Sequence, residues 1–471
     1  MGRHGKKGII LEITVQTLKN RIKREGVVKE ILKRHFNGKV YLVGGAIREL
    51  CLKKKPNDYD FVLSEQKDLK IMESLFGAGA FVLGKKPIQT YRIVRDDISV
   101  DITLLNTTIE EDLLRRDFTM NSIAYDIHGD SIIDSLNGID DIKAKIIRYP
   151  SKNTLKDDPL RMLKAIRHFS VLKGFMLHDT LKDAIIELGY LINEVAPERI
   201  KYEMDQIIIS GNVLAGLNTM TSTGLIFKIF PELYALKQMD IEKEFTLETY
   251  GHTIGGFKYL KRYCRLYKLD EKILSSVGYA LLFHDLGKAY TFSFDEQKGL
   301  VHFFYHERIS CEIASAIMER LRFSTHEIRS IESLIKNHMR IFLISSNEST
   351  EKAVRRLVYK MGDLTPSLIL LTLCDMYGSS GGKENPSTRH IKIKCREISN
   401  EYNEWQKEPL PNLVNGYDLM ELGFIEGPEI GKTLGNIREK QISGELNTKE
   451  EALDYALTLL NPQSDDNALD F

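Results

Sequence analysis

Two aspartates, Asp58 and Asp60, stand one residue apart in the stretch KKPNDYDFVL, residues 54–63. The surrounding residues predict a β-strand. Successive side chains of a strand point to opposite faces, so both carboxylates lie on one face. Two unpaired carboxylates side by side repel each other, and one of them holds its proton unless a cation joins them. The pair therefore predicts a metal site, with an ordinary surface strand carrying two solvated aspartates as the alternative.

A glycine pair precedes these aspartates in YLVGGAIREL. A strand, then Gly44 and Gly45, then a helix start exposes backbone N–H groups with no side chain in the way, which suits a phosphate. Arg48 lies one turn into that helix and is placed to reach the same anion. Asp101 in SVDITLL can supply a third carboxylate. A phosphate cradle beside carboxylates is what Mg²⁺-assisted phosphoryl or nucleotidyl transfer requires.

The elements that position these residues follow from the apolar pattern. Residues 15–35 carry apolar side chains at helical spacing, and residues 39–150 alternate as strands with one early helix. The two halves of YRIVRDDISVDITLL predict a hairpin around Asp96 and Asp97. From about residue 155 almost everything has a helical period, with breaks that suggest boundaries near 150, 240 and 400. We expect an α/β head followed by all-α domains.

The composition indicates a reduced, cytoplasmic, multidomain protein. The chain has 471 residues, 42% hydrophobic and 28% charged, with zero formal net charge. Its five cysteines form no close cluster, so neither a disulfide framework nor a zinc-cysteine site is expected. The longest apolar runs, such as SLILLTLC, are too short to span a membrane. Residues 1–55 hold fifteen Lys or Arg against four Glu, which predicts either contact with a nucleic-acid backbone or a solvated amphipathic helix.

Further motifs carry a resemblance to a known family. GGxxR and D-x-D are followed by RRDFTMN at 115–121, by DDPLR at 157–161 and by PER at 197–199. In this order they resemble the class II tRNA nucleotidyltransferase and bacterial poly(A) polymerase family, which has a polymerase-β-like head. The stretch 413–455 is also similar to the tail of that family. The first acidic residue of the fourth motif is Asp157 here, where the family has Glu.

The resemblance assigns roles to individual positions. Arg116, Asp117 and Asn121 would hold the ribose and phosphates of the nucleotide, with Asp117 accepting from a 2′-hydroxyl. Asp158 and Arg161 would hydrogen-bond the edge of the incoming base, so that protein side chains replace a template. Their spacing of three predicts that they share one face of a helix. Arg199 belongs to the motif that follows. Without the family, an exposed ion pair would explain Asp158 and Arg161 equally well.

The length of one connection between predicted elements bears on which nucleotides the protein would add. Only Asn106, Thr107 and Thr108 separate the strand of Asp101 from the segment that leads to the R-R-D motif. Family members that add C, C and A have a flexible segment at this place, whereas a shortened one resembles the CC-adding branch. The alternative is that another loop, such as GKKPIQTYR at 84–92, does the same work. CC addition is thus favoured over complete CCA addition, and poly(A) synthesis is third.

A second constellation occupies the middle of the chain. The order of its histidines and aspartates resembles the HD phosphohydrolase superfamily, including the extra histidines of binuclear members. Mixed nitrogen and oxygen ligands suit Mn²⁺, Ni²⁺, Fe²⁺ or Mg²⁺. The expected metal ligands are His252, His284, Asp285, His306, His338 and Asp375.

Together these observations predict a basic amphipathic segment (1–38), a nucleotidyltransferase head (39–150), a helical neck (151–240), an HD domain (241–400) and a helical tail (401–471). The expected partners are tRNA and CTP, with ATP second, and no membrane. Mg²⁺ is expected at Asp58 and Asp60, and a transition metal or Mg²⁺ at the HD site. Two competing interpretations remain: a metal-dependent phosphohydrolase whose head only docks RNA, and a non-catalytic RNA-binding protein.

Overall fold

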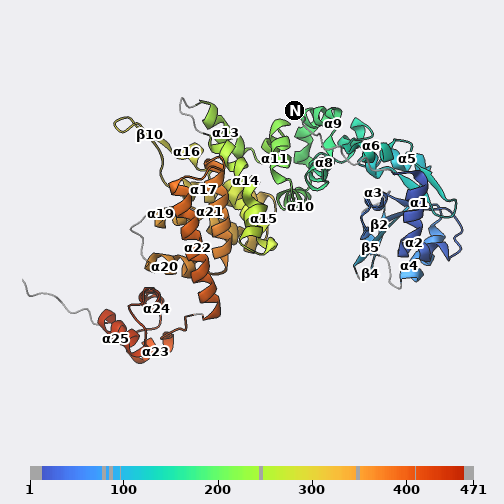
Figure 1. Ribbon diagram of the computed structural model, residues 1–471. Helices are drawn as coiled ribbons and strands as arrows, with labels where there is room; N and C mark the ends of the chain where they lie inside the picture. Colours follow the sequence, from blue (N-terminus) through green and yellow to red (C-terminus); the bar gives the residue numbers. More distant parts are fainter. Residues whose placement is uncertain are drawn as a thin grey trace, which may run out of the picture. The chain divides into compact units, whose positions relative to one another are not determined.

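The computed structural model describes residues 13–76, 81–83, 89–95, 97–242, 248–345, 351–408 and 410–460. The chain forms two compact units that divide between Ile229 and Phe230. The predicted class, an α/β head followed by helical domains, is confirmed (Figure 1).

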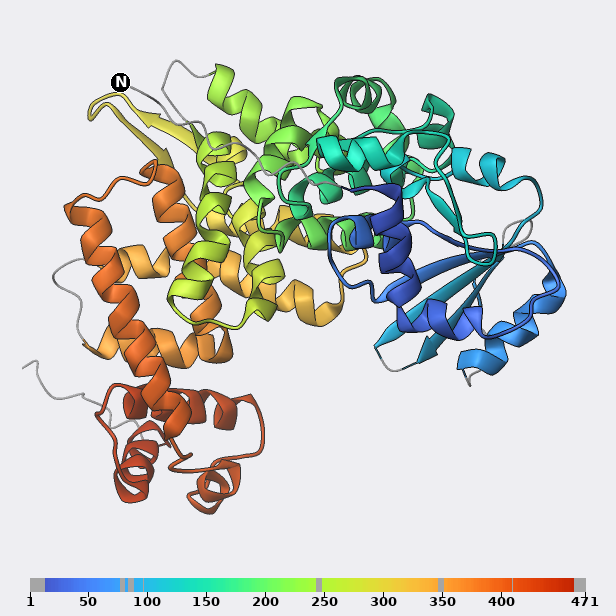
Figure 2. The ribbon, with the colours of Figure 1, turned by 45° about the vertical axis from the view of Figure 1, so that its right-hand side comes forward.

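The head in the first unit is built on a seven-stranded sheet in the order β3-β4-β5-β2-β1-β6-β7 (blue strands in Figure 2). β2 and β5 are parallel, and all the other neighbours are antiparallel. β4 and β5 form the predicted hairpin, because Arg95 is directly opposite Ile98. The strands are β1 (Val40–Val43), β2 (Asp58–Leu63), β3 (Phe81–Leu83), β4 (Thr90–Arg95), β5 (Ile98–Leu104), β6 (Ala124–Asp126) and β7 (Ser131–Ile133).

Helices pack on this sheet, and the basic amino-terminal segment is among them. The predicted helix over 15–35 is in fact two helices with a break at Glu25, whose backbone is extended. Leu18, Ile22 and Ile31 are fully buried, so both helices belong to the core of the head. Lys23 pairs with Asp130 at 2.8 Å. The helices are α1 (Val15–Arg24), α2 (Gly26–Leu32), α3 (Gly45–Cys51), α4 (Leu69–Phe76), α5 (Ile109–Leu114) and α6 (Gly138–Ala144).

The rest of the first unit is helical. A small parallel pair, β8 (Ile146–Ile147) with β9 (Met176–Leu177), lies beside α6 and α8. The apolar faces of α8 and α10 pack together and bury residues such as Leu163 and Met204. The helices are α7 (Lys152–Asp157), α8 (Leu160–Val171), α9 (Asp179–Leu188), α10 (Pro197–Ile208), α11 (Val213–Ser222) and α12 (Leu225–Ile229).

The second unit contains a helical domain around α21, which is buried along most of its length. By length and composition Glu351–Ser379 could cross a membrane, but 67% of its most apolar window is buried, as in the core helix of a folded domain. A hairpin, β10 (Phe292–Asp295) with β11 (Leu300–Phe303), projects between α16 and α17. The helices are α13 (Glu232–Glu242), α14 (Thr249–Leu266), α15 (Leu274–Phe283), α16 (Lys288–Thr291), α17 (His306–Arg320), α18 (Thr325–Asn337), α19 (Arg340–Ile344), α20 (Glu351–Met361), α21 (Thr365–Ser379) and α22 (Pro386–Lys407).

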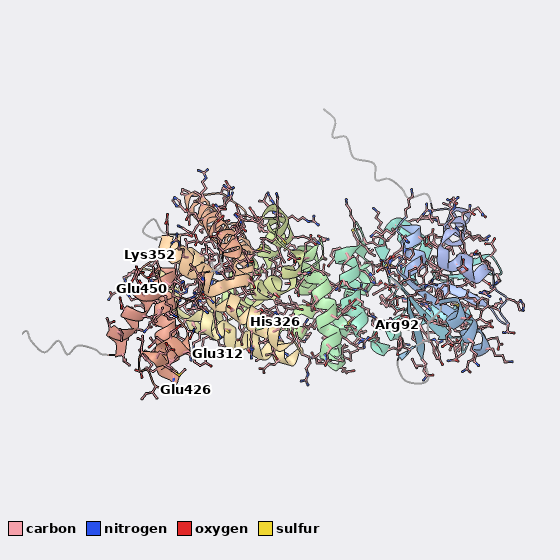
Figure 3. All side chains as sticks on the ribbon, turned by 90° about the horizontal axis from the view of Figure 1, so that it is seen from below. Arg92, Glu312, His326, Lys352, Glu426 and Glu450 are labelled. Atoms are coloured by element: carbon pink, nitrogen blue, oxygen red, sulfur yellow. The ribbon has the colours of Figure 1, made fainter. Side chains whose placement is uncertain are left out.

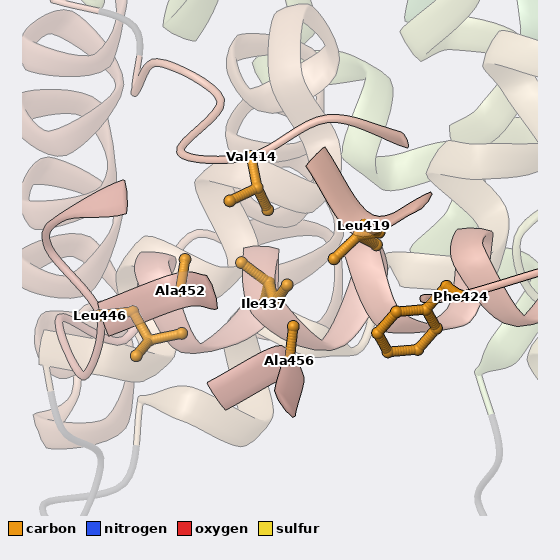
Figure 4. Close-up of a cluster of buried hydrophobic side chains, with 7 residues drawn as sticks. All are labelled: Val414, Leu419, Phe424, Ile437, Leu446, Ala452 and Ala456. Atoms are coloured by element: carbon orange, nitrogen blue, oxygen red, sulfur yellow. The ribbon is translucent and has the colours of Figure 1, made fainter. Parts of the chain in front are cut away.

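The carboxy-terminal part of this unit is the predicted small helical tail. It consists of α23 (Gly416–Glu421), α24 (Pro428–Ile442) and α25 (Lys449–Leu460). Figure 4 shows the buried side chains that hold the three helices together, among them Leu419, Phe424 and Ile437.

Candidate active site and metal centre

The structure brings the three predicted carboxylates of the head together. Asp58 and Asp60 lie on one face of β2, while Tyr59 and Phe61 are buried on the opposite face. Because β2 and β5 are parallel and in register, Asp101 lies directly beside Asp60. Three acidic side chains thus meet on neighbouring strands in an oxygen-rich arrangement of the kind that Mg²⁺ prefers.

The electrostatics of Asp60 show why the three carboxylates favour a bound cation. Burial raises the pKa of this carboxyl, and the neighbouring charges of Asp101, Asp117 and Asp58 raise it further. Arg116 acts in the opposite direction and is the main charge that favours ionised Asp60. A divalent ion bound by oxygens at this place would remove the repulsion. The donor set therefore fits a magnesium site.

The glycine turn is packed tightly against these carboxylates. Gly44 has a φ of +76°, which favours glycine, and forms the junction between β1 and α3. A Cβ atom at Gly44 would lie 2.6 Å from Asp60 Oδ2 and 3.3 Å from Arg116 Nη1. Only glycine therefore lets β1 approach Asp60 this closely. Gly45 begins α3.

A chain of hydrogen bonds connects the glycine turn to the R-R-D motif. Arg48 is buried and donates from Nη1 to Asn121 Oδ1 at 2.6 Å. Asn121 donates from Nδ2 to Asp117 Oδ1 at 2.9 Å, and the backbone N–H of Phe118 donates to the same oxygen. Burial lowers the pKa of Arg48. Arg48 therefore holds the R-R-D motif in place through Asn121, and it also lies beside the glycine turn.

Asp112 is a site residue that the sequence analysis missed. Its Oδ2 accepts from Nε and Nη2 of Arg116, at 3.2 and 3.0 Å. Asp112 lies near the end of α5 and Arg116 two residues beyond it, and this spacing of four is a detectable signal for such a pair. Asp112 aims the arginine that faces Asp60.

The predicted base-reading residues meet, but not as expected. We predicted that Asp158 and Arg161 share a continuous helix, and this is wrong. Asp158 is extended and lies between α7 and α8, because Pro159 disfavours helical backbone in the residue before it. Its carboxylate nevertheless lies 4.0 Å from Arg161 Nε and accepts from Arg199 Nη2 at 3.1 and 3.0 Å. The three motif residues therefore form one cluster.

A cavity of about 600 Å³ joins this cluster to the head. Arg116 and Arg161 both line it, and the sequence analysis had not assigned most of the other lining residues. They come from β4, from β5, from α5 and from the residues next to these elements, and Gln66 comes from the short helical turn Gln66–Asp68. The remaining lining residues are Gln66, Gln89, Tyr91, Thr103, Leu104, Asn106, Asp112 and Arg115. Its size falls within the range of small-molecule sites.

All six predicted ligands of the HD constellation gather in the second unit. His284 caps the end of α15 and lies beside Asp285. Asp285 forms one group with His252 and His284 and a second with His306 and His338, so it is shared by both. Asp375 of α21 lies 3.6 Å from His284 Nε2. This arrangement has the donors for two metal ions with one carboxylate in common.

The histidines are oriented for metal binding. Nδ1 of His284, of His306 and of His338 each faces a backbone carbonyl three residues earlier, at 2.8, 2.9 and 2.7 Å. A carbonyl only accepts, so each Nδ1 carries the hydrogen and each Nε2 is directed to the cluster. The buried atoms His284 Nε2 and Asp285 Oδ1 have no hydrogen-bond partner. A metal ion would satisfy both.

The charges of the HD cluster lead to the same conclusion. Burial lowers the pKa of His284, but the carboxylates Asp285 and Asp375 outweigh burial and raise it to about 10. Conversely, although burial alone raises the pKa of Asp285, the charges of His284 and Lys288 bring it well below its usual range. Lys288 Nζ lies 2.7 Å from Asp285 Oδ2. The site therefore holds a positive charge that a metal ion can replace.

Comparison with known proteins gives three family matches along the chain. Residues 40–148 match the poly A polymerase head domain. Residues 174–236 match a probable RNA and SrmB-binding site of polymerase A. Residues 249–378 match the HD domain. The three carboxylates fall in the first match and all six HD ligands in the third.

Curated relatives extend over nearly the whole chain. A CC-adding tRNA nucleotidyltransferase of Thermus thermophilus is 31% identical over 425 residues, covering 88% of this chain and 92% of that protein. An A-adding tRNA nucleotidyltransferase of Deinococcus radiodurans is 28% identical, covering 87% and 93%. The solved structure of the Bacillus stearothermophilus CCA-adding enzyme in complex with CTP has a TM-score of 0.61 at 20% identity, covering 93% and 97%, and shares the fold.

Proposed function

We propose that this chain, which belongs to the class II tRNA nucleotidyltransferase family with an HD domain, adds two cytidine nucleotides to the 3′ end of tRNA from CTP. The family gives the reaction class, nucleotide addition at a tRNA 3′ end. The grouping of Asp58, Asp60 and Asp101 next to Arg116 is the observation that carries the site assignment. The choice of CTP and the number of additions are the finer parts of the proposal.

The head residues divide the reaction among them. Mg²⁺ held by Asp58 and Asp60 would polarise the α-phosphate and favour departure of pyrophosphate. Arg116, fixed by Asp112, offers its charge to the phosphates from the cavity wall. Asp117 has one oxygen engaged by Asn121, and we assign its other oxygen to the ribose 2′-hydroxyl.

Base selection belongs to the cluster of Asp158, Arg161 and Arg199. A guanidinium and a carboxylate side by side supply both donors and acceptors, as the edge of a cytosine requires. Arg199 supports Asp158 through two hydrogen bonds, and Arg161 lines the cavity. Fixed side chains in these positions make a nucleic-acid template unnecessary.

Replacing Arg161 by alanine is expected to relax base selectivity. Loss of hydrogen bonds to the base lowers the preference for CTP over ATP and UTP by about 10–100-fold, since one charge-assisted bond contributes ~1.5–3 kcal/mol. Single-turnover incorporation with each nucleotide measures this ratio. Lys156→Ala, an exposed change on the neighbouring α7, is the matched control. An unaltered ratio in Arg161→Ala would remove this residue from the base site.

The short connection between β5 and α5 supports two additions without a third. Arg115 Nη2 donates to Thr107 Oγ1 at 3.2 Å, and Thr108 caps α5 by accepting from the backbone of Glu111. Two of the four residues between β5 and α5 are thus tied to the helix that leads into the R-R-D motif. Such a connection does not act as a lever that changes the nucleotide. The alternative loop lies mostly outside the described residues, at 84–88.

The product can be sized directly. Two transcripts, tRNA ending at the discriminator base and tRNA ending in CC, are incubated with CTP and ATP separately and together. We expect two C residues on the first and none on the second. Two C residues followed by a single A on the first transcript would make the protein a complete CCA-adding enzyme, and a ladder of A residues would make it a poly(A) polymerase.

The HD cluster favours a second activity, metal-dependent phosphate-ester hydrolysis. The supporting observation is that buried His284 Nε2 and Asp285 Oδ1 lack partners beside Lys288, a cation suited to a substrate phosphate. Cyclic nucleotide phosphates added to the same assay test it. Their hydrolysis without any nucleotide incorporation would make the head only an RNA-docking module.

A further inference from the structure

Arg92 holds Asp101 from the neighbouring strand. It lies on β4 directly opposite Asp101 of β5. Its Nε donates to Oδ1 at 2.7 Å and its Nη2 to Oδ2 at 2.6 Å. Both carboxylate oxygens are thus engaged by one planar guanidinium, the most directional form of this pairing. Figure 3 labels Arg92 on the head.

The guanidinium also acts on the other two carboxylates. Hydrogen bonding to Asp101 is the main reason that the pKa of Arg92 is raised, and the charges of Asp58 and Asp60 contribute in the same direction. The side chain of Asp101 is about a fifth exposed and that of Arg92 is 45% exposed, so solvent screens part of the attraction in this pair. The guanidinium of Arg92 therefore fixes the position of Asp101 and also reduces the repulsion among the three carboxylates.

The fixed carboxylate has a place in the proposed reaction. The 3′-oxygen of the RNA forms a bond to the α-phosphorus, the bond to the pyrophosphate oxygen breaks, and pyrophosphate leaves with that electron pair. The hydroxyl proton must go to a nearby base. With the Arg92 side of its carboxylate engaged, Asp101 presents only its remaining lone pairs, in one orientation, to that proton.

We propose that Arg92 is a positioning residue for nucleotidyl transfer, which orients Asp101 as the acceptor of the 3′-hydroxyl proton. The inference rests on the proposed function of the head. Arg92 contributes orientation through its two parallel hydrogen bonds, and it contributes positive charge beside three carboxylates. The reaction rate reports the first contribution and metal affinity reports the second.

Arg92→Ala is expected to slow the reaction and at the same time strengthen metal binding. The kcat for CTP falls about 10–100-fold, as for loss of other partners that orient a reacting group, while KM changes less than about threefold. The affinity for Mn²⁺ without nucleotide, followed by electron paramagnetic resonance, rises several-fold because a positive charge beside the carboxylates is gone. General damage to the site would weaken Mn²⁺ binding instead.

Two matched variants separate charge from orientation. Arg92→Lys keeps the charge but cannot make two parallel hydrogen bonds, so Mn²⁺ affinity returns toward that of the natural protein while kcat recovers only in part. Arg95→Ala is the second variant. Arg95 lies three residues after Arg92 on the same strand, so its side chain points to the opposite face. It is expected to change neither quantity.

A double-mutant cycle decides whether Arg92 acts through Asp101. In an Asp101→Ala background, Arg92→Ala is expected to cause no further loss of rate. Additive losses, unchanged rate or weakened Mn²⁺ binding in Arg92→Ala would each overturn the inference. Failure of the natural protein to incorporate any nucleotide would instead refute the proposed function, and the Mn²⁺ titration can be made without activity.

Discussion

Asp60→Asn abolishes nucleotide incorporation. The expected loss in kcat is about a thousandfold or more, equal to ~4 kcal/mol of transition-state stabilisation, because the substitution removes a central oxygen ligand and its charge. Asp60 lies between Asp58 on its own strand and Asp101 on the next. Primer-extension assays measure the rate, and filter binding measures retention of tRNA, which should change little.

The same substitution is not expected to unfold the head. Burial and neighbouring carboxylates raise the pKa of Asp60, so the folded protein binds its proton more tightly than the unfolded chain. Stability is therefore lost as the pH rises from the ordinary aspartate range through this raised pKa, and at neutral pH the ionised group destabilises the fold. Neutral asparagine removes that cost, so the melting temperature without metal should stay equal or rise. Asp140→Asn, an exposed helix position, is the control. Turnover within tenfold of the natural protein would refute the role of Asp60.

The strand face on which each carboxylate of the head lies could be predicted from sequence, but its neighbours could not. Alternation along DYDFVL separates Asp58 and Asp60 from buried Tyr59 and Phe61 by local geometry alone. The register that places Asp101 beside Asp60 depends on a parallel pairing between distant strands, which alternation along one strand does not specify. Arg92 was not identified, because nothing local distinguishes a cross-strand partner from an ordinary arginine on the rim of a sheet.

The incorrect prediction of secondary structure at Asp158 has a local cause. The spacing of the residues in DDPLR predicts one helix, but the proline within this stretch disfavours a continuous helix. Pro159 turns the preceding residue to extended backbone, and α8 begins only after it. The cluster still forms, because Arg161 lies in the first turn of α8 and Arg199 reaches Asp158 from α10. The prediction that Asp158 lies near Arg161 is therefore correct, although the continuous helix from which it was made does not exist.

The helical break at Glu25 illustrates a different limit. Apolar spacing from Val15 to Leu32 is nearly continuous, so it predicts one helix. In the structure Glu25 leaves helical geometry and accepts a hydrogen bond from the hydroxyl of Tyr59 at 2.8 Å. Its partner lies on the buried face of β2, thirty-four residues away. A tertiary contact thus accompanies the break, and sequence periodicity carries no information about it.

Asp285→Asn and His284→Ala are each expected to lose the metal of the HD site. The order of the ligands could be predicted from the motif, whereas the shared position of Asp285 between two histidine groups required the fold. Removing either donor should lower metal affinity by about 100-fold or more and reduce the bound ion, measured by mass spectrometry of the purified protein, to background. His326→Ala is the control, since this histidine is exposed on α18 (labelled in Figure 3).

The pH dependence of metal binding gives a second readout of the same prediction. The pKa of His284 is raised to about 10, so at neutral pH its Nε2 holds a proton that a metal ion must displace. Affinity should therefore rise about tenfold per pH unit between 7 and 9 and level off above the pKa, with one proton released for each ion bound at this nitrogen.

Nucleotide addition should persist in both variants, because the three carboxylates of the head lie in the other unit. Metal content equal to that of the natural protein, in Asp285→Asn as well as in His284→Ala, would show that these residues form a hydrogen-bonded core cluster and not a metal centre.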